Sequence, residues 1–335
     1  MNYDHLIALS TPRGVFEHCS GQTPLPEHGY CVDDVARALI IIARDPSPPP
    51  EVAGIADTCL DFLSAAQHVD GSVTNRQSVD GTWTGDPDVQ DHWGRALWAW
   101  GTVVGRSSNL DQIERCVGAF RLSSGQRSPF LRSMAHAALG AAEYVRRFPT
   151  STSALDLLAD TRNMALRHRD AAIPWPESRL TYANAVIPHA VIAAGLHLHE
   201  SDTLDYGLEM LEWLTRLQSP HGYLSPIGNG GWGPGDPLPA FDQQPLEVSH
   251  LVDAWLLAFD ATSDSQWLEW ARLGAMWFYG FNDVGVWMHD PRTGAGFDGL
   301  TPTGANPNCG AESTLAYLAT VGQVGAYQEA FQVTA

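Results

Sequence analysis

Acidic residues recur along this 335-residue sequence, each at or shortly before the start of an apolar segment. They are Asp33 and Asp34, Asp91, Glu177, Glu247 and Glu312. An acid at a helix start is common in any protein, because it caps free N–H groups and complements the helix dipole. Glu is a weaker cap than Asp, so Glu247 and Glu312 favour a shared role beyond capping. Carboxylates gathered at one place can supply the proton donor and the base that cleavage of a glycosidic bond requires.

The segments that carry these acids alternate between two kinds of predicted helix. Six segments are apolar on nearly all sides, and five lie between them with one apolar stripe each: 33–44, 91–104, 131–147, 182–199, 246–261 and 312–324, then 51–67, 110–121, 154–167, 203–218 and 266–279. A helix that is apolar all round must be buried, whereas a one-striped helix faces solvent. The alternation predicts an all-α fold, a single (α/α)6 toroid over residues 1–335, with six inner and about six outer helices. An open solenoid is less consistent, because the repeat lengths vary.

The longest loops precede the predicted inner helices and would therefore gather at one mouth of the ring. They span residues 18–32, 68–90, 170–181, 221–245 and 282–310, with short strand-like pieces at 72–83 and 284–288. Loops at one end of a rigid scaffold commonly build the functional pocket. In a six-fold ring, the first inner helix faces the fourth and the second faces the fifth. Asp91 with Glu247 is then the first candidate catalytic pair, and Asp34 with Glu177 is the second.

Other residues near the predicted mouth are candidates for contact with a sugar. Aromatic rings with polar edges suit stacking on a pyranose. The candidate substrate-binding residues are Asp33, Tyr182, Asn184, His189, Trp232, Asp242, Gln243, His250, Glu312 and Trp93, and Trp83 and Trp175 also fall beside the mouth. Arg37 and Arg95 follow Asp33 and Asp91 by four residues, a spacing that predicts structural ion pairs on one helix face.

Composition excludes several classes of function. The 38 acidic and 19 basic residues give a net charge of −19, which disfavours nucleic acid and anionic membranes as partners. Every basic residue is Arg, so Schiff-base chemistry, a pyridoxal anchor and a phosphate-loop lysine are excluded. The five cysteines are widely spaced and predict neither a disulfide framework nor a zinc site. We expect no cofactor and no metal, and the N-terminus has no export signal, so we expect a cytoplasmic protein.

Histidines leave a second chemistry open. Glu247 and His250 have i, i+3 spacing, and His92 and His189 fall at or near the starts of two other inner helices. A Glu-x-x-His motif repeated on two helices, as in carboxylate-bridged metal sites, is absent, so a metal site is not expected. Sugar 2-epimerases also use an (α/α)6 barrel with His acid and base residues. An epimerase or isomerase therefore remains an alternative.

Five ordered motifs, at 29–39, 94–98, 180–185, 241–247 and 310–314, resemble a family of bacterial proteins. Its members occur alone or fused to glycosyltransferases and are similar to (α/α)6 glycoside hydrolases. The resemblance implies the toroid, carbohydrate chemistry and a functional association with a glycosyltransferase. Glycosyltransferase activity itself is not expected, because the sequence lacks the alternating βαβ pattern of a nucleotide-sugar domain.

The match to this family is incomplete at four positions. The family pattern has Asn at Val35, an acid at Gln90, His at Trp93 and Asp at Ala183, whereas Asp242 and the acids named above match. Because the set of acids matches, we expect an inverting glycoside hydrolase that acts on an oligosaccharide or a glycan end. The four departures keep a second alternative open, a non-catalytic glycan-binding partner of a glycosyltransferase.

Overall fold

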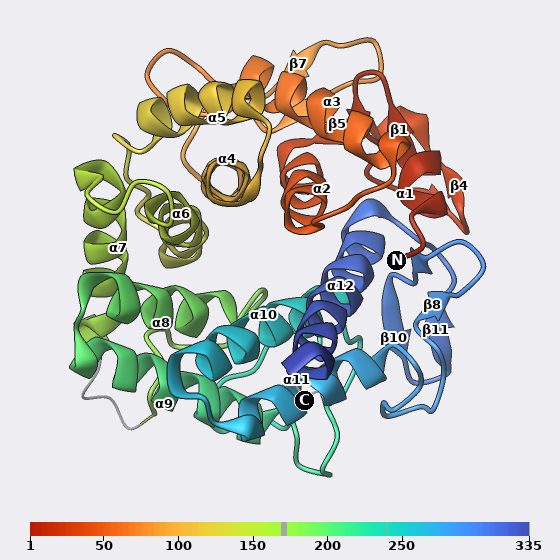
Figure 1. The fold of residues 1–335 in the computed structure, drawn as a ribbon. Coiled ribbons are helices and arrows are strands. Elements are labelled where there is room, and N and C mark those ends of the chain that lie inside the picture. The colour runs from red at the N-terminus through yellow and green to blue at the C-terminus, as the bar shows by residue number, and fades with distance from the viewer. Residues whose placement is uncertain (169–172, 239, 335) are drawn as a thin grey trace.

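Six long helices form a closed inner ring in the computed structural model, which describes residues 1–168, 173–238 and 240–334 (Figure 1). They are α2 (Val32–Arg44), α4 (Asp91–Arg106), α6 (Leu131–Val145), α8 (Val186–Leu198), α10 (Pro245–Thr262) and α12 (Ala311–Thr334). Each packs against the next, and α12 packs against α2, which closes the ring. The predicted (α/α)6 toroid is confirmed.

An outer layer of helices covers this ring. Each outer helix packs against the inner helix that precedes it: α3 (Pro50–Ala66), α5 (Leu110–Ser123), α7 (Thr152–Ala165), α9 (Ser201–Leu217) and α11 (Ser265–Trp277). The sixth outer position, beside α12, is taken by the short helix α1 (Asp4–Leu9). The sequence analysis did not predict α1, because six residues are too few to show helical periodicity. The start and the end of the chain thus complete one helix pair together.

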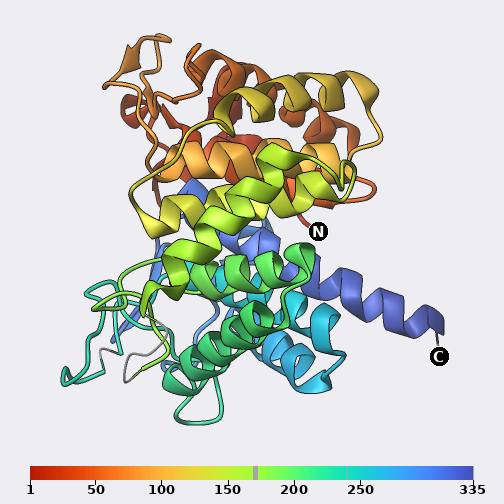
Figure 2. The ribbon, with the colours of Figure 1, turned by 90° about the vertical axis from the view of Figure 1, so that its left-hand side faces the viewer.

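The long loops gather at one end of the helices, as predicted, and the last turns of α12 extend from the other end (Figure 2). This loop-covered end is called the mouth below. Its short antiparallel strands are β1 (Ser10–Thr11), β2 (Gly14–Val15), β3 (Cys19–Ser20), β4 (Thr23–Pro24), β5 (Tyr30–Cys31), β6 (Arg76–Gln77), β7 (Trp83–Thr84), β8 (His289–Asp290), β9 (Ala295–Gly296), β10 (Gly299–Thr301) and β11 (Gly304–Asn306). They pair as hairpins, except that β5, β6 and β7 form one sheet that joins the loops before α2 and α4. Short 3-10 turns lie at Pro26–His28 and Leu166–His168.

One inner helix starts later than predicted. The helix expected from Tyr182 begins at Val186, because Ala183 has a left-handed φ of 47° that a helix cannot contain. The loop before it, expected from residue 170, begins at residues that lie outside the described ranges. Residues 182–185 therefore belong to the mouth rather than to α8.

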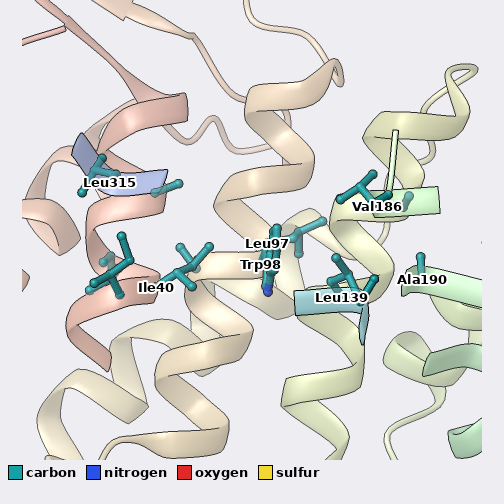
Figure 3. Packing of buried hydrophobic residues seen from close by; sticks show 14 of the residues in the cluster. Ile40, Leu97, Trp98, Leu139, Val186, Ala190 and Leu315 are labelled. Atoms are coloured by element: carbon teal, nitrogen blue, oxygen red, sulfur yellow. The ribbon is translucent and has the colours of Figure 1, made fainter. Parts of the chain in front are cut away.

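The interior of the ring is packed with large apolar side chains and small residues. Figure 3 shows Ile40 of α2, Trp98 of α4 and Leu139 of α6 converging with side chains from α8 and α12. The helices α4 and α6 approach so closely that a Cβ atom added at Gly101 would meet the backbone of Gly140. Among the described helices, none is both long enough and apolar enough to cross a membrane.

Candidate functional site

Two adjoining pockets open at the mouth. The first, of about 400 Å³, lies between the starts of α2 and α12 and is called the α2–α12 pocket. The second, of about 570 Å³, lies between the starts of α4 and α6 and is called the α4–α6 pocket. Asp33 and Tyr182 line both pockets, so they form a shared wall. Two connected pockets of this size can hold neighbouring units of one elongated ligand.

Carboxylates from the predicted set line these pockets. Asp34 and Glu312 line the α2–α12 pocket, and Asp91 and Glu177 line the α4–α6 pocket. The helices explain this convergence: Asp34, Asp91 and Glu312 lie in the first turns of inner helices, which all start at the mouth, and Glu177 lies in the loop before α8. The gathering of Asp33, Asp34, Asp91, Glu177 and Glu312 at one mouth agrees with the prediction.

Arginines join these acids between neighbouring helices. The Arg37 guanidinium bonds Asp34 at 2.6 Å and Glu312 at 2.8 Å, which links α2 to α12. Arg95 lies 2.5 Å from Asp33 and 3.8 Å from Asp91 through the same nitrogen, which links α4 to α2. The predicted pairing of Arg95 with Asp91 is present, but Arg37 pairs with Asp34 rather than with Asp33. The contacts of these acids thus run between neighbours in the ring, not between facing helices.

The third inner helix, α6, contributes a positively charged arginine instead of an acid. Arg132, near the start of α6, donates to Glu177 at 2.6 Å and to the backbone carbonyl of Tyr182 at 2.6 Å. Its guanidinium carbon also lies 5.0 Å from the centre of the Tyr182 ring, a cation–π contact. No acid was predicted for this helix, and Arg132 occupies the corresponding position.

Tyr182 is the exposed aromatic ring on the shared wall. The side chain is 43% exposed, and its hydroxyl donates to Asp91 at 2.7 Å. Burial of the hydroxyl and the neighbouring Asp91 raise the pKa of Tyr182 above its usual range, so the phenol stays protonated. The ring of Tyr182 can therefore stack on a sugar while its hydroxyl holds one oxygen of Asp91 in place.

The two consecutive acids of α2 have pKa values that their surroundings shift in opposite directions. Burial of the Asp34 carboxyl raises its pKa to about 6 although the charge of Arg37 opposes the rise, and nearby Glu312 and Glu17 add to it. Burial acts in the same direction on Asp33, but the positive charges of Arg95 and Arg37 outweigh it and lower the pKa of Asp33. Near neutral pH, Asp33 is therefore fully ionised, whereas Asp34 can carry and release a proton.

Glu247 lies beneath the pockets rather than in their lining. The side chain is 2% exposed, and its carboxylate accepts hydrogen bonds from the backbone N–H groups of Ala183 and Asn184 and from the Asn184 amide. Burial raises the pKa of Glu247, and these hydrogen bonds oppose the rise. The structure thus places Glu247 and Asn184 where they hold the segment that presents Tyr182. This placement argues against the predicted catalytic pairing of Glu247 with Asp91 and against the predicted contact of Asn184 with a ligand.

Three further candidates from the loops also lie away from both pockets. Gln243 is fully buried and bonds Asp283 and the indole N–H of Trp277. Asp242 is exposed, and Trp232 packs beside Trp213 with its N–H bonded to a backbone carbonyl. The next residue in the chain, Gln244, does line the α2–α12 pocket.

The remaining tryptophan candidate and the two histidines are buried. Trp93 has no exposed surface and donates to the carbonyl of Ser123, so its predicted contact with substrate is inconsistent with this position. His189 and His250 lie deeper in the ring, around the Trp98 indole, at centre distances of 6.1 and 5.9 Å. Burial lowers the pKa of His189 to about 4 and that of His250 well below its usual value, so both are neutral at neutral pH.

Further polar groups in the α2–α12 pocket were missed by the sequence analysis. Glu17 and Asp298 line it and come from loops without a helical pattern, so no sequence signal pointed to them. The Cys31 thiol also lines the pocket and donates to Asp34 at 3.2 Å. Possible metal ligands of Glu17, Cys31 and Asp34 lie within 4.8 Å of one another, but Arg76 and Arg37 already bond the two carboxylates.

Comparison with known proteins supports the fold. No family model and no curated protein sequence matches the chain. Among solved structures, it is similar to a cellobiose 2-epimerase from Spirochaeta thermophila (TM-score 0.71, 12% identity, 96% of this chain and 93% of that one). It is also similar to a D-mannose isomerase (0.72, 12%, 98% and 95%) and to a GH76 α-mannanase from Bacteroides thetaiotaomicron (0.65, 11%, 91% and 88%). The neighbours share the (α/α)6 fold and differ among themselves in activity.

Proposed function

We propose that this protein is a carbohydrate-active enzyme, a glycoside hydrolase, that acts where its two mouth pockets meet. The observation that carries the proposal is the pair of acids on either side of the shared wall. Asp34 has its pKa raised to about 6 and lines one pocket, and Asp91 accepts two hydrogen bonds and lines the other. Glycosidic cleavage needs such a pair, a proton donor and a carboxylate base.

In the proposed reaction, the glycan lies across the wall with one unit in each pocket. Asp34 protonates the glycosidic oxygen as its bond to the anomeric carbon breaks, and Asp91 removes a proton from a water that attacks this carbon from the opposite face, so the configuration inverts. Asp33, ionised beside Arg95, accepts hydrogen bonds from sugar hydroxyl groups, and Tyr182 stacks on a ring. Glu247 serves as a positioning residue that acts through the segment carrying Tyr182.

The test is digestion of a glycan panel by the purified protein, with released sugars measured by mass. We expect release by the wild type and its loss in Asp34→Asn and Asp91→Asn variants. Glu209→Gln, an exposed acid on the outer helix α9, is the matched control and should keep full activity. Release that persists in both mouth variants would overturn the proposed roles.

An epimerase or isomerase is the second candidate, and the fold it shares with solved epimerases favours it. That candidate requires a histidine at the reacting carbon, so it predicts that His189 or His250 is essential. Interconversion of reducing monosaccharides without bond cleavage, lost on His250→Phe, would replace the hydrolase proposal. Saturable glycan binding with neither reaction would favour the glycan-binding partner of a glycosyltransferase.

A further inference from the structure

Among the side chains that the structure describes, exposed aromatic rings gather at two places. These exposed Phe, Tyr and Trp residues are Phe130, Tyr182, Tyr279, Phe281 and Trp287. The first two line the α4–α6 pocket. The other three lie within nine residues of one another, between α11 and β8, and are 39, 45 and 51% exposed. They are called the aromatic strip below.

The aromatic strip is held rigidly by the turn beneath it. The buried Asn282 amide donates to the carbonyls of Trp277 and Val286, both at 2.8 Å, and its oxygen accepts from the backbone of Gly285. The turn brings Trp287 within 5.7 Å of Tyr279, and Trp287 also stacks on buried His289. Rings that are already ordered lose little conformational entropy on binding, which is typical of a recognition surface.

Polar groups accompany the rings at the edge of the strip. Tyr223 lies 5.7 Å from Phe281, and its hydroxyl donates to Asp283 at 3.1 Å. His221 lies beside Tyr223, and Asp283 also accepts from Ser225. A surface of aromatic faces with hydroxyl, imidazole and carboxylate edges matches a sugar ring, which has apolar C–H faces and hydroxyl edges.

The loops that carry the strip and its neighbours also contribute to the α2–α12 pocket. The strip lies on the loop before α12, which supplies Asp298 to that pocket, and its neighbour Tyr223 lies on the loop before α10, which supplies Gln244. Buried Gln243 joins the two loops, because its side chain bonds Asp283 and its backbone pairs with Leu300.

We propose that the aromatic strip is a second carbohydrate-binding surface that holds neutral polysaccharide outside the catalytic pockets. This inference rests on the proposed function for its biological sense, although binding at the strip is independent of catalysis. The occupant is neutral because the chain carries a net charge of −19, which repels acidic polysaccharides. Arg272, on the neighbouring helix α11, is already paired with Glu269.

The test measures retention of the protein on insoluble cellulose, α-mannan and starch, all in an Asp34→Asn background that cannot consume the ligand. We expect retention on at least one of these neutral polymers and none on alginate, an acidic polymer. Trp287→Ala and Phe281→Ala should each weaken binding roughly two- to tenfold, and Trp287→Phe should keep part of it. The control is Leu110→Ala, an exposed apolar residue at the start of α5, on the far end of the ring.

Each outcome separates the strip from the active site. Retention that is unchanged in Trp287→Ala and Phe281→Ala, or absent on all three polymers, overturns the strip as a carbohydrate-binding surface. A change in oligomeric state in these variants, seen by light scattering, overturns it in favour of a second copy as the occupant. Retention that depends on the strip without any sugar release by the wild type leaves the strip standing and removes the hydrolase. Hydrolysis of short oligosaccharides that is unchanged in the strip variants, with no retention on any polymer, leaves the hydrolase standing and removes the strip.

Discussion

Replacing Asp33 and Asp34 one at a time by Asn should change the stability of the fold in opposite directions at neutral pH. The two residues are adjacent on α2 and both face the mouth, so position and helix propensity are matched. They differ in what surrounds the charge. Asp34 shares Arg37 with Glu312, whereas Asp33 has Arg95 at 2.5 Å and the Asn75 amide at 3.0 Å.

The magnitude for Asp34 follows from its raised pKa. Burial moves the pKa of Asp34 from 3.8 to about 6, so between these values the folded state binds a proton more tightly than the unfolded state. The free energy of unfolding therefore falls as pH rises through this window, by about 3 kcal/mol in total for this group. Asn carries no charge to desolvate, and Arg37 keeps Glu312 as a partner. We expect Asp34→Asn to raise the free energy of unfolding at pH 7 by about 1–2 kcal/mol.

Asp33 should behave in the opposite way. Arg95 and Arg37 lower the pKa of Asp33, so its ionised form stabilises the fold above its unfolded pKa. In Asp33→Asn, the nearly buried Arg95 keeps only the longer contact to Asp91 at 3.8 Å. Because a buried charge without a close partner is costly, we expect a loss of about 2 kcal/mol at pH 7.

Urea unfolding of the wild type and both variants, between about pH 4 and pH 7, measures these differences directly. The wild-type free energy of unfolding also contains other titrating groups, so the quantity to compare is the difference between each variant and the wild type. The Asp34→Asn difference should grow toward stabilisation as pH rises from 4 to 6. If Asp34→Asn is instead destabilised at pH 7 as much as Asp33→Asn, the carboxylate of Asp34 is held by Arg37 in its charged form, and the proton-donor argument fails.

Three further changes test the architecture around the mouth. Gly101→Ala should lower the free energy of unfolding by about 1–3 kcal/mol, because α4 and α6 must separate to admit the Cβ atom. The control is Gly118→Ala on solvent-facing α5, where a Cβ meets no atom, and it should be neutral or stabilising by up to about 1 kcal/mol. Urea unfolding distinguishes the two variants, and equal effects would contradict the close packing of α4 and α6. Tyr182→Phe keeps the ring but loses the hydrogen bond to Asp91, so we expect kcat to fall more than KM rises in sugar-release kinetics; a change confined to KM would mean that the hydroxyl only binds. Glu247→Gln replaces one carboxylate oxygen, an acceptor, by an NH2 group that can only donate toward the backbone N–H groups. We therefore expect the free energy of unfolding to fall by about 1–3 kcal/mol and hydrogen exchange at residues 180–185 to become faster. Unchanged exchange there would refute the positioning role.

The ring of helices could be predicted from the sequence, because a helix that is buried on all sides has apolar residues on all its faces, whereas a surface helix has one apolar stripe. The inner helices from Asp91 and Leu131 begin at the predicted residues. The start of α8 could not be predicted, because the left-handed Ala183 donates its N–H to the carboxylate of Glu247, which lies 64 residues later in the chain.

The location of the acids was likewise a property of the sequence, since a carboxylate at a helix start lies at the mouth once all inner helices start there. Which carboxylates face a ligand was decided only by tertiary structure. Asp34 and Glu247 occupy similar places near the starts of their helices, yet one lines a pocket and the other is covered by residues 183 and 184. The physical reason is that contact with a pocket, hydrogen-bond partners and pKa depend on loops from distant parts of the chain, such as those that bring Glu17 and Asp298 to the pocket. The helices of the ring have recognisable apolar patterns in the sequence, whereas the irregular loops that complete the site have no repeating pattern from which their positions could be predicted.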